Sequence, residues 1–156
     1  MTVKRKAYII ISWTLVVTCM VFIFWMSGFN ATESSGMSDS IIRKILAVFG
    51  EEFSSFVVRK AAHMLEFCAL AMTLFNAIYS SWGKKSTPFW AFGGTVVYAI
   101  TDEIHQLFVE GRACRVFDVF VDSFGALIGI IFAIIILKII LKFRERGNKN
   151  GSIKTF

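Results

Sequence analysis

Several ionisable side chains that can move protons or bind ligands lie inside or at the ends of apolar segments of this chain. They are Arg59, Lys60, His63, Glu66, Asp102, Glu103, His105 and Asp118. A charged side chain at the centre of a membrane helix costs about 2.5–3.5 kcal/mol on insertion scales. Such a group persists only where it pairs with another, faces the interior of a bundle or lines a wet cavity. The clustering therefore requires an explanation in terms of packing or chemistry.

The residue types in this set suggest acid–base chemistry and the binding of a charged head group. The candidates for acid–base work are His63, Glu66, Asp102 and Glu103, because carboxyl and imidazole groups can donate and accept protons. The candidates for ligand binding are Arg59, Lys60, Gln106, Arg112, Asp118 and Asp122. Guanidinium and ammonium groups suit a phosphate or carboxylate.

Two alternatives compete with this interpretation. One is a structural network of salt bridges that only fixes how the helices pack. The other is a divalent metal held by His63, Glu66, Asp102 and Asp118, since His63 and Glu66 have the i, i+3 spacing that two ligands on one helix use. The cluster contains no cysteine and the chain no His-Glu-x-x-His motif, so the sequence does not favour the metal.

The apolar segments that carry these residues predict an all-α integral membrane protein. The chain has 156 residues, of which 56% are hydrophobic, and its mean hydropathy is +0.65. Four spans are expected at about residues 8–27, 56–80, 88–109 and 117–141. At 1.5 Å per residue, each is long enough to cross a hydrocarbon core of about 30 Å. One four-helix bundle over residues 1–156 follows, with no second domain.

Charge and amphipathicity predict how the bundle sits in the membrane. Lys and Arg gather before the first span, in the 81–87 link and in a basic tail over residues 142–156 that we expect to fray. The positive-inside rule then places both termini in the cytoplasm, and the net charge of +6 reflects topology, not nucleic-acid binding. Residues 41–49, which connect the first two spans, have the spacing of a short amphipathic helix lying at the membrane–water interface.

This topology brings the polar residues to one depth on the outer side. The second span enters the membrane there, the third ends there and the fourth begins there. At 100° per residue, Arg59, His63 and Glu66 fall within a stripe of about 60°. A second stripe holds Asp118 and Asp122 with the packing glycines Gly125 and Gly129, a Gly-x-x-x-Gly pair that permits close helix approach.

The order of these motifs resembles that of the VanZ-like family of small bacterial membrane proteins. The matching strings are Arg59-Lys60-Ala61-Ala62-His63-Met64-Leu65-Glu66-Phe67, Asp102-Glu103-Ile104-His105-Gln106, Gly111-Arg112, and Asp118-Val119-Phe120-Val121-Asp122-Ser123-Phe124-Gly125. They cover the second to fourth spans. The resemblance implies a multi-pass protein of the cytoplasmic membrane of Gram-positive-type bacteria. It also implies a link to glycopeptide resistance, in particular to teicoplanin.

Three functions follow as hypotheses. In the first, the outward-facing polar cluster binds a membrane lipid or a lipid-linked envelope intermediate and lowers sensitivity to lipoglycopeptides such as teicoplanin. In the second, the cluster is an intramembrane acid–base or metal-assisted enzyme that acts on a phosphorylated or glycosylated lipid. In the third, the chain is a small transporter or proton relay, although no inverted repeat is visible. The sequence favours the first.

Overall fold

The computed structural model describes residues 2–29, 55–110, 112 and 115–153. Its helices are α1 (Val3–Ser27), α3 (Ser55–Trp82), α4 (Thr87–Gln106) and α5 (Val116–Ile153). The prediction of an all-helical fold with four helices is confirmed for these residues, among which no strand occurs. The interfacial helix expected at residues 41–49 falls outside them, and the orientation of the termini stays a prediction.

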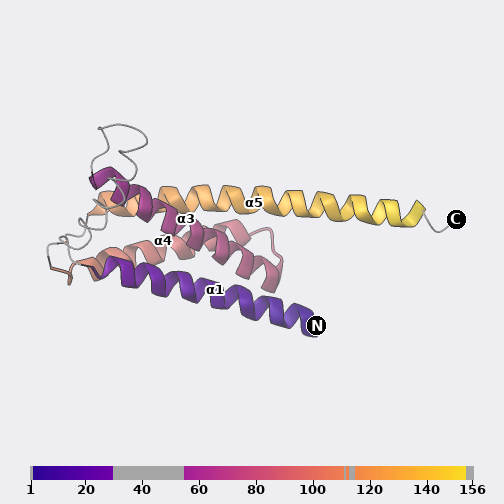
Figure 1. Cartoon of the computed structure of the whole chain (residues 1–156), viewed down its shortest axis with the longest axis horizontal. Coiled ribbons are helices and arrows are strands. Elements are labelled where there is room, and N and C mark those ends of the chain that lie inside the picture. The colour runs from indigo at the N-terminus through magenta and orange to yellow at the C-terminus, as the bar shows by residue number, and fades with distance from the viewer. Residues whose placement is uncertain (1, 30–54, 111, 113–114, 154–156) are drawn as a thin grey trace, which may run out of the picture.

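Local sequence explains the tight connection between α3 and α4. Gly83 follows the last residue of α3 with a φ of +60°, a left-handed conformation that glycine adopts without steric cost, and its N–H donates to the Tyr79 carbonyl at 2.8 Å. Pro88 lies in the first turn of α4, where its missing N–H removes no helical hydrogen bond. A short link therefore joins the two helices, which run antiparallel (Figure 1).

Helices α1, α3 and α5 are long and apolar enough to cross a membrane, as expected of a membrane protein. Helix α4 has 20 residues, a length of about 30 Å, but it does not reach the same apolarity. The reason lies on its inward face, where the buried positions are small or polar: Thr87, Ala91, Thr95, Ala99, Asp102, Glu103 and Gln106. The lower apolarity of α4 thus follows from the small and polar residues that it buries inside the bundle.

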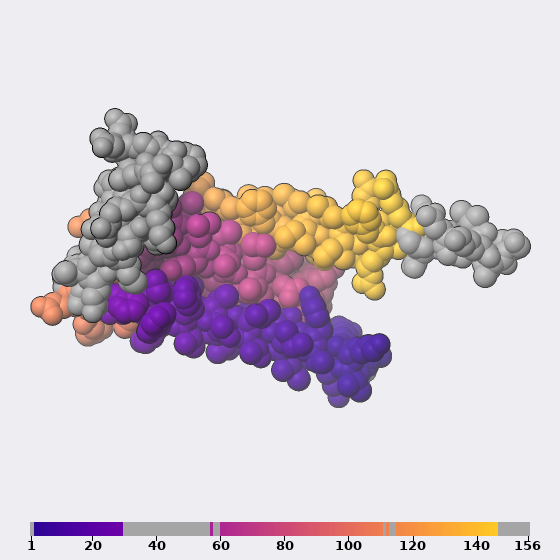
Figure 2. Space-filling model, in the orientation of Figure 1, coloured from indigo at the N-terminus to yellow at the C-terminus, as the bar shows by residue number. Residues whose placement is uncertain are grey.

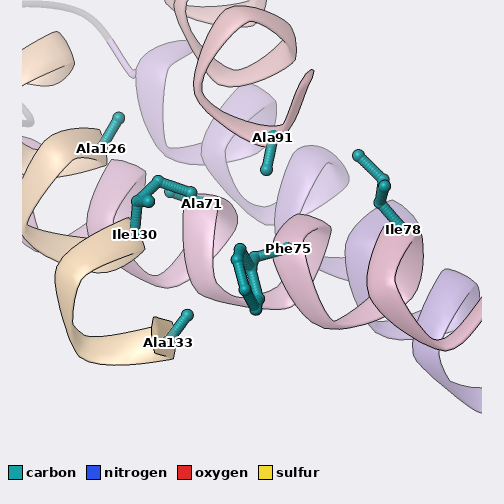
Figure 3. Packing of buried hydrophobic residues seen from close by; sticks show 7 residues of the cluster. All are labelled: Ala71, Phe75, Ile78, Ala91, Ala126, Ile130 and Ala133. Atoms are coloured by element: carbon teal, nitrogen blue, oxygen red, sulfur yellow. The ribbon is translucent and has the colours of Figure 1, made fainter. Parts of the chain in front are cut away.

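Helix α3 is the centre of the bundle. It packs against α1, α4 and α5, whereas the backbones of α1 and α5 do not approach each other closely in the described residues. The core where α3 meets α4 and α5 is built from small and large apolar side chains, Ala71, Phe75, Ile78, Ala91, Ala126, Ile130 and Ala133 (Figure 3). The alanines let the helix backbones approach closely, and Phe75 fills the space that they leave.

Gly125 and Gly129 lie where α5 comes closest to α3. A Cβ atom added at Gly125 would overlap the carbonyl oxygen of Met64, and one added at Gly129 would overlap that of Cys68. Both obstacles are backbone atoms, which no rotamer change can move. The two helices therefore depend on glycine for their present separation, and this contact fixes where the first turns of α5 lie.

The basic segment beyond the fourth predicted span is helical up to Ile153, so the helix continues past the predicted end of the span at about residue 141. Whether this segment frays stays a prediction. Lys and Arg are good helix formers, so the basic residues that end the apolar run can continue the helix. Figure 1 shows α5 extending past the other helices, and Figure 2 shows the orange-to-yellow surface of its earlier part lying against α3.

Candidate functional site

The end of the bundle where α4 ends and α5 begins gathers ionisable groups from three helices and one link. We define the polar cluster as Lys60, His63 and Glu66 of α3, Asp102, Glu103 and Gln106 of α4, Arg112 of the link, and Asp118 and Asp122 of α5. Its members form two ranks. The α4 residues and Asp122 are buried, while the α3 residues, Arg112 and Asp118 are partly exposed.

Helix α4 supplies most of the buried rank. Asp102, Glu103 and Gln106 expose only 3%, 2% and 3% of their surface. The Gln106 side-chain amide donates to Asp102 Oδ2 at 3.0 Å, and the backbone N–H of Arg115 donates to Glu103 Oε2 at 2.9 Å. The second bond ties the link that precedes α5 to the end of α4, so it positions the start of α5 as well.

Three buried carboxylate oxygens lack a hydrogen-bond partner among the described residues: Oδ1 of Asp102, Oδ1 of Asp118 and Oδ2 of Asp122. Asp118 Oδ1 forms an ion pair with Lys60, whereas the other two oxygens have no such pair, and the side chains of Asp102 and Asp122 are at least 97% buried. Asp122 is close enough to Asp102 and Glu103 to interact with both electrostatically. Burying several carboxylates together without compensation is costly, so protons, water or a ligand must offset part of their charge.

Lys60 forms an ion pair with Asp118 Oδ1, which links the start of α3 to the first turn of α5. The side chains are 17% and 15% exposed, so the pair lies at the edge of the buried rank and is reachable from outside. Such a pair can stabilise the bundle. It can also present an ammonium group to an anionic ligand, because Lys60 carries a charge that a phosphate would attract.

His63 and Glu66 form a second pair on the same face of α3. Nδ1 of His63 lies 3.9 Å from Oε2 of Glu66, and each side chain is 15% exposed. That separation exceeds a direct hydrogen bond but suits two groups that share a proton through water or a substrate atom. Asp102 interacts electrostatically with both, so the pair adjoins the buried rank.

Arg112 closes the cluster at the α4–α5 link. Its Nη1 donates to the Gln106 side-chain oxygen at 3.4 Å and its Nε to the Phe29 carbonyl at 3.3 Å. Both distances are long for such bonds. The guanidinium nevertheless lies between the end of α1 and the end of α4, and it interacts electrostatically with His63 and Glu66. It is thus a second cation at the edge of the cluster.

His105 lies apart from the acidic residues. Its ring stacks on Phe24 of α1 with centroids 4.1 Å apart, and its Nδ1 lies 3.3 Å from the hydroxyl oxygen of Ser27. The side chain therefore connects α4 to α1. Arg59 belongs to α3, but its side chain is not among those described.

The contribution of α1 was missed from the sequence. Ser27 is fully buried beside His105, and the Tyr98 hydroxyl donates to the Met20 carbonyl at 2.6 Å. A signal was present, because the buried residues of α1 are Ser12, Val16, Ile23 and Ser27, which share one helical stripe. Two serines on the inner stripe of an apolar helix indicate polar partners on a neighbouring helix.

The metal alternative gains no support from the described residues. Among them, no three or more His, Cys, Asp or Glu side chains are arranged to hold a metal ion. His63 and Glu66 lie together, and Asp102 interacts with both, but the set that also includes Asp118 is not assembled around one point. What the arrangement offers is carboxyl groups of differing burial beside one imidazole and two cations.

A protein-family model described as VanZ/LLP1 matches residues 12–138 of the chain. The match confirms the resemblance seen in the motifs and extends it to α1, of which only the first turns lie outside the matched range. No curated protein and no solved structure matches the chain.

Proposed function

Because the chain belongs to the VanZ/LLP1 family, we propose that it binds a lipid of the bacterial cell envelope at the polar cluster and thereby lowers sensitivity to lipoglycopeptides such as teicoplanin. In this proposal the protein crosses the cytoplasmic membrane several times, with both termini in the cytoplasm and the cluster toward the outside. The cluster would then meet lipid head groups at the outer leaflet, where such drugs act.

The observation that carries the proposal is the two-rank arrangement of the cluster. Lys60 and Arg112 lie at its edge, where an anionic phosphate would approach, and the buried carboxyl groups of Asp102 and Asp122 lie behind them. Carboxyl oxygens without protein partners can accept hydrogen bonds from sugar hydroxyls or amides of a head group. A purely structural network would instead be expected to satisfy its buried oxygens within the protein.

The test is the growth-inhibiting concentration of teicoplanin, measured beside vancomycin, in a susceptible Gram-positive host that expresses the protein. The Asp102→Asn variant removes one buried charge while it keeps the shape of the side chain. Glu110→Gln makes the matched change at an exposed carboxyl outside the cluster. All proteins are compared at equal membrane abundance.

The proposal expects wild type and Glu110→Gln to raise the teicoplanin concentration selectively and Asp102→Asn to lose that effect. If Asp102→Asn protects as well as wild type, the cluster is not the functional site. If wild type protects against neither drug, the protective function is refuted for this chain.

The His63–Glu66 pair favours a second candidate, an intramembrane acid–base enzyme that acts on a phosphorylated or glycosylated lipid. Glu66 and His63 are partly exposed and adjoin Asp102. Both interact electrostatically with Arg112, and His63 does so with Lys60 as well, as a proton-transferring pair beside a bound phosphate would. Pure protein in detergent should then convert a polyprenyl-phosphate or glycerophospholipid substrate, and Glu66→Gln should abolish turnover. Absence of turnover across a lipid panel, with and without divalent metal, would refute the enzyme.

A further inference from the structure

An apolar cavity of about 510 Å³ lies at the end of the bundle opposite the polar cluster. Its lining residues come from α1, α3, α4 and the link between α3 and α4: Trp13, Leu74, Ile78, Trp82, Lys84 and Trp90 among them. A volume in the range of about 300–1,000 Å³ is typical of sites for small ligands. Since α4 begins here and ends at the polar cluster, the cavity and the cluster are separate.

The walls of the cavity are held in place by contacts within the bundle. The Trp13 indole N–H donates to the Ser81 hydroxyl at 3.1 Å, and the rings of Trp13 and Trp82 meet edge to face with centroids 6.2 Å apart. Trp90 faces the cavity from the first turn of α4. Three indoles on three helices thus form an aromatic surface that suits a hydrocarbon chain.

The rim of the cavity is positively charged. Lys84 belongs to the lining, Lys85 is the next residue, and the start of α1 at the same end of the bundle carries three more cations (Figure 1). No acidic residue occurs between residues 67 and 101 or before residue 33. The first turn of α4 also contains no acid, and its N-cap residue Ser86 makes no side-chain cap bond, so the positive end of the helix dipole lies at the rim.

We propose that this cavity binds an anionic phospholipid of the bilayer, with an acyl chain against the three tryptophans and the phosphate at Lys84 and the start of α4. An apolar volume with a cationic rim fits a molecule that carries a hydrocarbon chain and a negative charge at one end. A zwitterionic lipid offers the same chain without the net charge, so the site selects by head group. The proposal does not depend on the function of the polar cluster.

The test measures lipid retention by native mass spectrometry of the full chain in detergent. Phosphatidylglycerol and phosphatidylcholine with identical acyl chains are added in equal amounts. Wild type is expected to retain phosphatidylglycerol several-fold more than phosphatidylcholine, and Lys84→Gln to lose that preference. Lys85→Gln makes the same change at a lysine that does not line the cavity, and it should keep the preference. Equal retention of the two lipids by wild type refutes the site, and so does an equal loss in the two variants, which would indicate diffuse charge attraction.

A second measurement locates the chain and does not depend on a lysine substitution. In a Trp25→Phe background the remaining tryptophans are the three that line the cavity. Phosphatidylglycerol with brominated acyl chains, reconstituted at low mole fraction in a phosphatidylcholine bilayer, should quench their fluorescence more than brominated phosphatidylcholine at the same fraction. Equal quenching by the two lipids would show that the cavity does not select the anionic head group and would overturn the proposal.

Discussion

The close approach of α3 and α5 predicts that Gly125→Ala destabilises the protein although alanine is the better helix former. Replacing a helical glycine by alanine normally gains about 0.5–1 kcal/mol. At Gly125, however, the new Cβ would overlap the Met64 carbonyl oxygen and lie 3.0 Å from both its carbonyl carbon and its Cα. Backbone atoms cannot rotate away, so the helices must separate, and such overpacking costs about 1–3 kcal/mol.

Gly93→Ala is the matched control, because a Cβ added at Gly93 meets nothing within 4 Å. It should gain the helix-propensity term of about 0.5–1 kcal/mol without a packing cost. The propensity gain is common to both variants, so they should differ by the packing cost alone, about 1–3 kcal/mol, with Gly125→Ala the less stable. For a chain of this size that difference corresponds to melting temperatures about 2–12 °C apart.

The assay is thermal unfolding of each purified variant in the same detergent, followed by loss of soluble monodisperse protein. Because Asp118 and Asp122 lie on the same face of α5 as Gly125, a displaced α5 should also weaken the polar cluster. Gly125→Ala is thus expected to lower protection against teicoplanin as well as stability. If Gly125→Ala is as stable as Gly93→Ala, the close contact between α3 and α5 does not exist. The position inferred for the acidic face of α5 would then be refuted as well.

Further predictions concern single contacts of the bundle. Lys60→Met and Asp118→Asn should each lower the free energy of unfolding by about 2–4 kcal/mol, and the double variant should recover part of the loss in a thermodynamic cycle, because a lone buried charge costs more than a missing pair. Additive effects would show that the ion pair does not form. Tyr98→Phe should cost about 1 kcal/mol by thermal unfolding, since it removes a hydrogen bond from α4 to α1, and an unchanged melting temperature would contradict this contact. Asp122→Asn should equal or exceed wild type in stability, because it removes a buried charge whose oxygen has no described partner, so a large loss in the same assay would show that the charged form is required.

The helices were predictable because they follow from long apolar runs with clear boundaries. Gly83 and Pro88 separate α3 from α4 in the sequence as they do in the structure. The end of α5 was not predicted, because hydropathy marks where a membrane span stops and not where a helix stops. Basic residues end the apolar run at about residue 142, yet they continue the helix.

The gathering of polar residues at one end was predictable from topology alone, since alternating helices place the start of α3, the end of α4 and the start of α5 together. The division of the cluster into a buried and a partly exposed rank was not predictable from the sequence. Periodicity places Glu103 to one side of the face shared by Asp102 and Gln106, yet all three are buried. Glu103 is covered because the link folds back and the Arg115 backbone N–H bonds to it, which no helical pattern encodes.

The charge balance of the cluster limits how a lipid head group can bind. The described residues place five carboxyl groups against the cations Lys60 and Arg112, and the buried rank itself contains only carboxyl and amide groups. A phosphate would be repelled from that rank and can lie only at the edge, near Lys60 and Arg112. The hydrogen-bonding sugar or peptide part of the head group is then the part that reaches Asp102 and Asp122. Recognition at this site should therefore discriminate among head groups by their hydroxyl and amide groups, with the phosphate serving to orient them.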